Sequence, residues 1–529
     1  MKKLISISLI LCILFSCSSF TVFAQEEQGE IIELCENIKF DTGTNTLYYS
    51  GKDIQNRAYF NVFDDSDFFN GEYNEKRETI FQRATKLVVK EGVKEIPHEY
   101  FHEMKNLEEV VLPSSLRYIE ELAFFDCPKL KGIYGENVTE ISLGAFANCT
   151  ALEYAEFPKI QFIGRNRITR VDPVFTFSKL DLDYVSFYDD DSSRRWCYPL
   201  HEEYIGSFQG CSSLEYAYIP NIKKLAPKTF YKCSSLNTIN ENNHLDNVTY
   251  VGRSAFFGCK SLESISLKSL KSLLSGHDPF ADTKNEGLFG NCTNLKSVNI
   301  PNAEYIGDGT FWGCSGLKKI NSNNTLSNVT TLGKYSFVGC KSLEKISFPK
   351  VKNIEYGKWV DYDEKELDII RKANIGELLE NTFNHCDTNK NAKTRYSSVF
   401  ANCTKLKSVK FSAVEKIGKN TFYGCNKLDN VQSGNKLKYI GDNAFYKCSS
   451  LKAVTIPKQV KQIGVRAFAR CTKLKTVNVK STSLKMVGLD AFKIINKTPT
   501  FNCPKSKLKT CKKLIKPNAP SKARFLGKY

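Results

Sequence analysis

Two groups of residues in this chain have the types and spacing that chemistry requires. His98-Glu99-Tyr100-Phe101-His102 matches the pattern His-Glu-x-x-His, which on a helix places two zinc ligands on one face beside a glutamate base. The second group is a set of 19 cysteines, which could form disulfides in an exported chain or bind a metal ion. Which chemistry is available depends on the elements that carry these residues.

A repeat positions most of the cysteines. The phrase Phe-x-x-Cys-x-x-Leu recurs along the chain, with Phe124 and Phe146 22 residues apart and Phe422 and Phe445 23 apart. The clean copies begin at Phe124, Phe146, Phe208, Phe230, Phe256, Phe289, Phe311, Phe337, Phe400, Phe422, Phe445 and Phe468. Degenerate copies begin at Phe101 with Met104, Phe383 with Cys386, and Phe492 with Ile495.

A second phrase separates these anchors. Leu295-Lys-Ser-Val298-Asn-Ile300-Pro301 alternates apolar and polar residues, which predicts a short, half-buried strand that the proline ends. Tyr305-Ile306-Gly307 follows, and we expect the glycine to permit a tight bend before Phe311 fills the interior. One such unit cannot bury its apolar face alone, so the units must stack. The sequence therefore predicts a β-rich solenoid with parallel strands and about 22–23 residues per coil.

The repeat unit closely resembles the BspA-like leucine-rich repeat (LRR_5 type) of bacterial surface proteins, over roughly Leu87 to Phe492. The leading segment and the Pro-Lys-Ser-Lys-x-Lys ending are similar to those of Gram-positive, clostridial members. The resemblance implies a leucine-rich-repeat solenoid. It also implies a non-enzymatic role in adhesion and in binding host proteins.

The first residues are typical of an export signal. Lys2 and Lys3 precede an apolar run, and Val22-Phe23-Ala24 offers a cleavage site, so residues 1–24 are predicted to be a signal peptide. An alternative is the lipobox-like Leu14-Phe15-Ser16-Cys17, which would make Cys17 a lipidated first residue. No later stretch is apolar enough to cross a membrane. We expect a secreted protein that associates with the cell surface.

Both ends are predicted to cap the solenoid, which spans residues 87–498. Within 25–86, Thr42-Gly43-Thr44-Asn45 and the following residues to Gly51 predict a β-hairpin. Residues 499–529 carry nine basic side chains and no acid, and the whole chain has a net charge of +18. This end is either a closing coil with a solvated charged face or a segment that anionic wall polymers retain. Nucleic acid is a poor fit, because the charge is spread through an exported chain.

Three breaks in the period lie near 165–204, 271–286 and 355–380, all at the same register of the coil, which puts them on one side. They are either binding loops or tolerated insertions. The candidate binding residues there are Asp189, Asp190, Asp191, Arg194, Arg195, Trp196, Trp359 and Tyr362.

The outward positions of the predicted strands form another candidate surface, since solenoids often bind partners on a broad sheet. An ordinary solvated face is the alternative. These positions are Tyr154, Glu156, Tyr216, Tyr218, Ser297, Asn299, Lys345, Lys410, Ala453 and Thr455.

The repeat also decides the chemistry. The repeat cysteines are expected to be buried small side chains, Cys503 and Cys511 are the favoured disulfide pair, and Cys35 and Cys197 stay unassigned.

The His-Glu-x-x-His segment aligns with the repeat, with Phe101 in the core and Met104 in the cysteine position, and no third zinc ligand is evident. The sequence contains no Cys-x-x-Cys, P-loop or dinucleotide motif, so we expect no metal and no cofactor.

We therefore predict a non-enzymatic protein that binds protein or glycan ligands on host or neighbouring cells. The first alternative is a structural envelope protein that its basic tail retains on anionic polymers. A zinc peptidase built on His98, Glu99 and His102 is the remote alternative.

Overall fold

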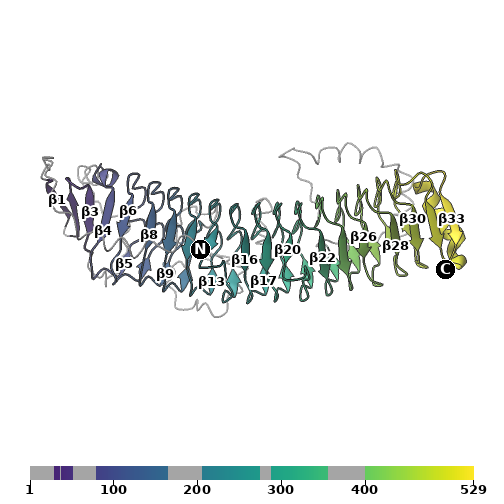
Figure 1. The fold of residues 1–529 in the computed structure, drawn as a ribbon, viewed down its shortest axis with the longest axis horizontal. Helices are drawn as coiled ribbons and strands as arrows, with labels where there is room; N and C mark the ends of the chain where they lie inside the picture. Colours follow the sequence, from purple (N-terminus) through teal and green to yellow (C-terminus); the bar gives the residue numbers. More distant parts are fainter. Residues whose placement is uncertain (1–28, 36, 52–78, 165–204, 274–286, 355–398) are drawn as a thin grey trace, which may run out of the picture.

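A computed structural model describes residues 29–35, 37–51, 79–164, 205–273, 287–354 and 399–529. Its coils stack along one long axis, with two rows of strands running side by side from end to end (Figure 1). The architecture is a parallel β-solenoid, as the repeat predicts. We call the two rows the primary sheet and the secondary sheet.

The primary sheet contains the first strand of each coil, and the strands pair in parallel in four consecutive ladders. In β18, Val298 points inward and is buried, while Ser297 and Asn299 are half-exposed. The strands are β4 (Lys86–Val89), β6 (Glu109–Val111), β8 (Gly132–Tyr134), β10 (Tyr154–Glu156), β12 (Tyr216–Tyr218), β14 (Thr238–Ile239), β16 (Ser264–Ser266), β18 (Ser297–Asn299), β20 (Lys319–Ile320), β22 (Lys345–Phe348), β24 (Ser408–Phe411), β26 (Asn430–Gln432), β28 (Ala453–Ile456), β30 (Thr476–Val479) and β32 (Thr500–Cys503).

The secondary sheet contains the second, two-residue strand of each coil, whose second residue is buried in the core. These strands are β5 (Glu95–Ile96), β7 (Tyr118–Ile119), β9 (Glu140–Ile141), β11 (Phe162–Ile163), β13 (Lys224–Leu225), β15 (Tyr250–Val251), β17 (Ser272–Leu273), β19 (Tyr305–Ile306), β21 (Thr331–Leu332), β23 (Asn353–Ile354), β25 (Lys416–Ile417), β27 (Tyr439–Ile440), β29 (Gln462–Ile463) and β31 (Met486–Val487).

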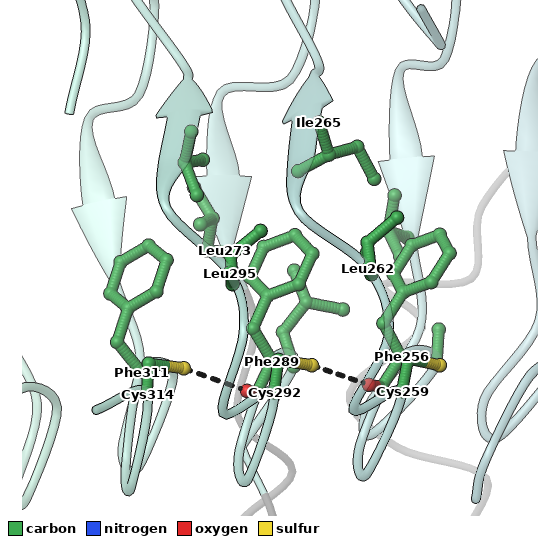
Figure 2. Packing of buried hydrophobic residues seen from close by; sticks show 14 of the residues in the cluster. Phe256, Cys259, Leu262, Ile265, Leu273, Phe289, Cys292, Leu295, Phe311 and Cys314 are labelled. Carbon is green, nitrogen blue, oxygen red and sulfur yellow. Dashed lines mark hydrogen bonds between the residues drawn. The ribbon is translucent and has the colours of Figure 1, made fainter. Parts of the chain in front are cut away.

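A column of stacked phenylalanine rings forms the centre of the core (Figure 2). The rings from Phe101 to Phe492 lie 5.0 to 5.7 Å apart, centroid to centroid, from each coil to the next. Phe101, Met104 and Phe492 are fully buried, so the first and last degenerate copies are true coils. The copy at Phe383 and Cys386 lies outside the described residues.

The column continues across the three breaks in the sequence period. Phe146 stacks on Phe208 at 5.4 Å, Phe256 on Phe289 at 5.6 Å, and Phe337 on Phe400 at 5.1 Å. The backbone N–H of Phe337 also donates to the carbonyl oxygen of Val399 at 2.9 Å. Coils on either side of a long connection therefore contact each other as ordinary neighbours do.

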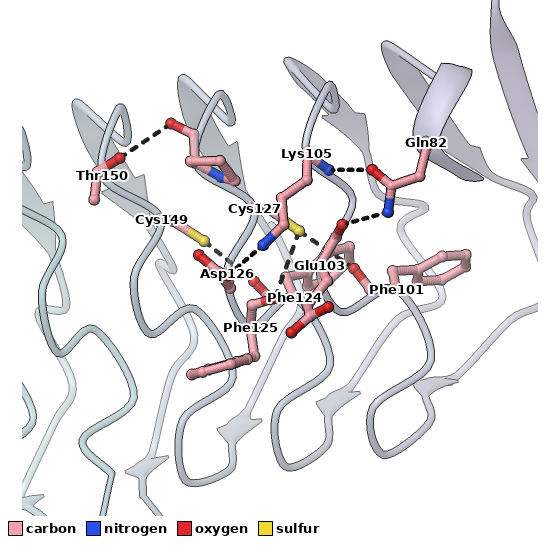
Figure 3. Close-up of polar contacts among 11 residues, drawn as sticks. Gln82, Phe101, Glu103, Lys105, Phe124, Phe125, Asp126, Cys127, Cys149 and Thr150 are labelled. Atoms are coloured by element: carbon pink, nitrogen blue, oxygen red, sulfur yellow. Dashed lines mark hydrogen bonds and ion pairs between the residues drawn. The ribbon is translucent and has the colours of Figure 1, made fainter. Parts of the chain in front are cut away.

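The repeat cysteines are buried, as predicted, but they do more than fill space. In twelve coils the thiol donates to the carbonyl oxygen of the phenylalanine one coil earlier, with Sγ–O distances of 2.9 to 3.2 Å (Figures 2 and 3). A thiol is a weak donor, yet in most coils it gives the buried phenylalanine carbonyl oxygen a second hydrogen-bond partner beside the backbone N–H of the cysteine in its own coil. Burial raises the pKa of the Cys292 thiol to about 12 and also raises the pKa values of Cys233 and Cys314.

The glycines after β21 and β29 have a role that the sequence did not predict. Gly333 and Gly464 do not lie in the left-handed region, so no unusual bend requires them. A Cβ atom on Gly464 would lie 2.5 Å from the backbone nitrogen of Asp442 in the preceding coil, and one on Gly333 would lie 2.4 Å from that of Asp308. Close approach between coils explains these two glycines, whereas Gly164 after β11 has a left-handed φ of 82° and allows the bend that we expected.

Left-handed backbone also occurs directly before the cysteine. Asn148, Asn291 and Asn402 have φ values of 62°, 59° and 60°, and Gly313 and Gly424 have φ values of 72° and 73° at the same position. Glycine and asparagine adopt this conformation at the lowest cost. This requirement explains why the residue before the cysteine is so often one of these two.

The N-terminal end is closed by an antiparallel hairpin, as the sequence predicts. β2 (Ile38–Asp41) pairs with β3 (Thr46–Tyr49) around the Thr42–Asn45 turn, and β1 (Ile31–Cys35) pairs with β2. β3 then pairs in parallel with β4 and so joins the hairpin to the primary sheet. Beside it, the Gln82 side chain donates to the carbonyl oxygen of Glu103 at 2.9 Å, from a helical segment that includes residues 79–83 (Figure 3).

The C-terminal end is closed by a short helical coil. The chain passes from β32 through the 3-10 helix η2 (Lys505–Lys507), helix α5 (Leu508–Ile515) and the 3-10 helix η3 (Lys516–Asn518). It then forms β33 (Arg524–Gly527), which pairs in parallel with β32 as the last strand of the primary sheet. Cys511 and Ile515 of α5 are buried in the core.

The buried thiols generate a test of the stacking. Replacement of Cys292 by Ala should lower the free energy of unfolding by about 1–3 kcal/mol at pH 7, because it removes a hydrogen bond and leaves a cavity. This cost should shrink above pH 9. There the wild-type unfolded chain ionises a thiol that the folded chain keeps protonated, so wild-type stability falls by up to about 1.4 kcal/mol per pH unit for that thiol.

Urea unfolding of Cys292→Ala and wild type at pH 7, 9 and 10 measures this difference. The outward substitution Ser297→Ala in the same coil serves as a control, whose effect should not change with pH. A constant cost of Cys292→Ala across this range would contradict the buried, protonated thiol.

Candidate binding face

The outward face of the primary sheet carries the side chains that the strand pattern predicts there. Their inward neighbours are buried, as Ala155, Val298 and Val409 illustrate. The following predicted positions are exposed or half-exposed: Tyr154, Glu156, Tyr216, Tyr218, Ser297, Asn299, Lys345, Lys410, Ala453 and Thr455. Their placement is confirmed, whereas their role in binding stays a prediction.

Aromatic side chains gather on three neighbouring strands of this face. Register pairs Tyr154 of β10 with Gly132 of β8 and with Tyr216 of β12, and it places Glu156 of β10 between Tyr134 and Tyr218. We call Tyr134, Tyr154, Tyr216, Tyr218 and Glu156 the aromatic patch. Tyr134 is not among the predicted positions, although Ile133 in the buried strand position indicates that the next residue points outward.

The tyrosines of the aromatic patch present broad surfaces to solvent. Tyr134 and Tyr154 are 49% and 45% exposed. The Tyr154 ring lies over Gly132, since a Cβ atom there would approach its Cζ to 2.1 Å. On the other side, the rings of Tyr216 and Tyr218 stack with centroids 6.4 Å apart and an 18° angle between planes. Large exposed aromatic groups on a rigid sheet are typical of recognition surfaces.

Glu156 is the acidic member of the aromatic patch. Its side chain is half-buried, and burial raises the pKa of its carboxyl. Burial and then the charge of Glu156 also raise the pKa of Tyr216. Within the described part of the chain, no hydrogen bond or ion pair reaches the Glu156 carboxylate. A partly desolvated carboxylate without a counter-charge is a costly arrangement.

Charge is segregated along the primary sheet, which the pattern of single repeats did not predict. On and beside β6 to β14, the exposed charged residues are mainly acids: Glu109, Glu136, Glu153, Glu215 and Glu241, with Lys129, Lys131 and Lys159 as exceptions. From β20 onward they are mainly bases: Lys318, Lys319, Lys345, Lys407, Lys410, Lys452, Lys475 and Arg524, with Glu344 and Asp429 as exceptions. The two ends of this face therefore suit ligands of opposite charge.

The predicted loop residues Asp189, Asp190, Asp191, Arg194, Arg195, Trp196, Trp359 and Tyr362 lie outside the described residues. The described chain does show where the long connections attach. It leaves after β11, β17 and β23, which are all strands of the secondary sheet, and it re-enters before the Phe-x-x-Cys turn. The shared register of the three attachment points is confirmed, and a binding role for the loops stays a prediction.

The His-Glu-x-x-His segment does not lie on a helix. Residues 98–103 form turns, Glu99 has a left-handed φ of 53°, and the ring of Phe101 points into the core. His98 Nε2 lies 3.6 Å from a carboxylate oxygen of Glu99, and both side chains are exposed. Among the described residues, no three His, Cys, Asp or Glu side chains are grouped closely enough to hold a metal ion.

Cys503 and Cys511 lie close together but are both free thiols, so the favoured disulfide is not present in this structure. A hydrogen bond between the two thiols raises the pKa of Cys503, and both side chains are buried. Cys511 belongs to α5, which packs against β33 and β31, and Cys503 is the last residue of β32. The Cys35 side chain and Cys197 lie outside the described residues.

The C-terminal coil displays its basic residues on the surface. Lys509, Lys512, Lys513 and Lys516 follow the helical i, i+3, i+4, i+7 spacing, and with Pro517 they line one shallow depression. In the described part of the chain, no helix is long and apolar enough to cross a membrane. The exposed basic residues are Lys505, Lys507, Lys509, Lys512, Lys513, Lys516, Lys522, Arg524 and Lys528.

Comparison with known proteins identifies the repeat. The profile of the "BspA type Leucine rich repeat region" matches with six copies, over residues 79–174, 203–285, 283–390 and 393–515. No curated protein matches the sequence.

Solved structures with a similar fold include bacterial leucine-rich repeat proteins. One from Bacteroides ovatus is 20% identical, with a TM-score of 0.41 and 84% of each chain covered. Another from Eubacterium ventriosum is 16% identical, with a TM-score of 0.38 and coverage of 88% of this chain and 95% of that one. A leucine rich cell surface protein from Faecalibacterium prausnitzii is 16% identical, with a TM-score of 0.32 and coverage of 89% and 95%.

Proposed function

This chain belongs to the BspA type leucine-rich repeat family, and we propose that it binds other macromolecules at a cell surface through its primary sheet. The proposal covers protein or glycan ligands on host or neighbouring cells. It includes export through residues 1–24 and retention at the surface, with lipid attachment at Cys17 as the alternative. The inserted segments near 165–204, 271–286 and 355–380 are proposed as additional contacts.

The aromatic patch is the observation that carries this proposal. Its tyrosines are rigidly placed on paired strands, and they expose apolar area together with hydroxyl groups that can bond to a ligand. Tyrosine is enriched among the residues that dominate binding energy at interfaces, partly because it loses little conformational entropy when it binds. A column of buried rings beneath the sheet supports these positions without any need for a bound partner.

The proposal predicts that the double substitution Tyr154→Ala and Tyr216→Ala weakens ligand binding at least tenfold, or about 1.4 kcal/mol. Purified residues 25–529 would be tested on immobilised host matrix proteins, mucins and isolated bacterial cell wall. Phe162→Ala is the matched control, because Phe162 is an exposed aromatic residue on the secondary sheet. Equal binding by the double variant and wild type would contradict a role for the primary sheet.

The lysine-lined depression on α5 favours a second candidate function, retention on anionic envelope polymers. Like charges at this spacing repel one another, and a polyanion laid along the helix would relieve the repulsion. In this role the solenoid acts as a spacer that the C-terminal coil holds on the wall.

For this second function, we expect Gln at positions 509, 512, 513 and 516 to abolish salt-sensitive binding to isolated cell wall. The four side chains are exposed and repel one another, so the melting temperature should not fall. The control replaces Lys319, Lys345, Lys410 and Lys475 by Gln, which removes the same charge from the sheet. Pull-down at two salt concentrations measures both, and equal losses would rule out a dedicated site on α5.

A further inference from the structure

We propose that the aromatic patch binds an arginine side chain of a protein ligand, with Glu156 as its counter-charge. This inference rests on the proposed function and deepens it, because it names the chemistry that the N-terminal end of the primary sheet recognises. Three features of the described residues lead to it: an unpaired carboxylate, exposed aromatic neighbours on both sides, and a surrounding excess of acids.

The Glu156 carboxylate supplies the first feature. It is half-buried on the middle strand of the patch, and the described residues offer it neither a hydrogen bond nor an ion pair. Two acids nearer the N-terminal end do have partners: the Glu109 carboxylate lies 2.9 Å from Lys86 Nζ, and Glu108 pairs with Lys131. The patch therefore contains a desolvated anion whose missing partner is a cation from outside the chain.

The tyrosines supply a surface that suits a planar cation. Tyr134 and Tyr218 lie one strand away from Glu156 on either side, at the strand spacing of about 4.8 Å. Cations are attracted to the face of an aromatic ring within about 6 Å of its centre. A cation at Glu156 thus lies within reach of both flanking rings.

The electrostatic field around the aromatic patch favours a positively charged ligand. Exposed Glu136, Glu153 and Glu215 lie on β8, β10 and β12 or directly beside them. Two bases beside these strands already have partners, since Lys131 pairs with Glu108 and the Lys159 ammonium donates to the side-chain oxygen of Asn137. Because the bases of this sheet gather from β20 onward, an acidic ligand would be attracted there and repelled here.

Arginine fits this arrangement better than lysine or a neutral sugar. Its planar guanidinium can stack on a tyrosine ring while two of its N–H groups donate to one carboxylate. An ammonium group is more strongly hydrated and cannot do both at once. A neutral sugar would stack on the rings but would leave the Glu156 charge unpaired.

The test uses residues 25–529 and a fluorescein-labelled peptide of six Arg-Gly repeats, with fluorescence anisotropy as the readout. Glu156→Gln should weaken peptide binding at least tenfold, and Tyr218→Leu should weaken it several-fold. Glu153→Gln is the matched control, since it removes the same charge from the same segment at an exposed position outside the patch. It should weaken binding less than threefold. A Lys-Gly peptide of equal length should bind at least threefold more weakly than the arginine peptide.

Equal effects of Glu156→Gln and Glu153→Gln would overturn the proposal, as would equal affinity for the arginine and lysine peptides. A concentration-dependent dimer in sedimentation that Glu156→Gln removes would also overturn it, because the arginine would then belong to a second copy. The proposed function fails separately. If the arginine peptide does not bind but the Tyr154 and Tyr216 double variant still loses its natural ligand, the sheet is a binding face for another chemistry.

Discussion

Hydrogen bonding between coils at the Phe-x-x-Cys turn is the interaction on which the rest of the structure depends. A turn cannot satisfy its own backbone groups, so the N–H of each phenylalanine donates to the next coil, as Phe289 does to Thr310 at 2.8 Å. The phenylalanine carbonyl then accepts the thiol of the next cysteine, as Phe289 accepts Cys314 at 3.0 Å. These bonds fix the distance between coils, which in turn lets the rings stack and the strands pair.

The fold could be predicted because every repeat contains the same strand pattern and the same buried aromatic position. One phrase shows alternation, another shows the buried aromatic position, and the period forces them to stack. Contacts between coils could not be predicted from one unit. The thiol hydrogen bond depends on where the phenylalanine carbonyl of the preceding coil lies. Gly464 is required because the backbone of Asp442 in another coil leaves no room for a Cβ atom. Likewise, the free Cys503 and Cys511 depend on how α5 packs.

The sequence predicts which residues of each strand point outward on the candidate binding face. It does not predict how these residues are arranged across neighbouring coils. Strand alternation placed Tyr154, Tyr216 and Tyr218 outward, because inward and outward residues alternate along every strand. Alternation also marks Tyr134 as outward, through its buried neighbour Ile133, but it does not show that these tyrosines lie side by side, since that depends on which residues face one another across coils. Charge segregation is also a property of the assembled sheet. The charged residues occupy the variable positions of the repeat, so the constant positions that define the repeat carry no information about the charge distribution.

The coils form one continuous column, and a face that spans many coils can act as one surface only if the coils beneath it are rigidly joined. The most direct test is hydrogen–deuterium exchange, read at single amides, for Phe146, Phe256 and Phe337, which donate across the three long connections. Phe208, Phe289 and Phe400 donate to the same position of an ordinary neighbouring coil and provide the reference. We predict equal protection in the two sets. Exchange at least a hundredfold faster in the first set would show that the solenoid is divided at those connections and would contradict the account.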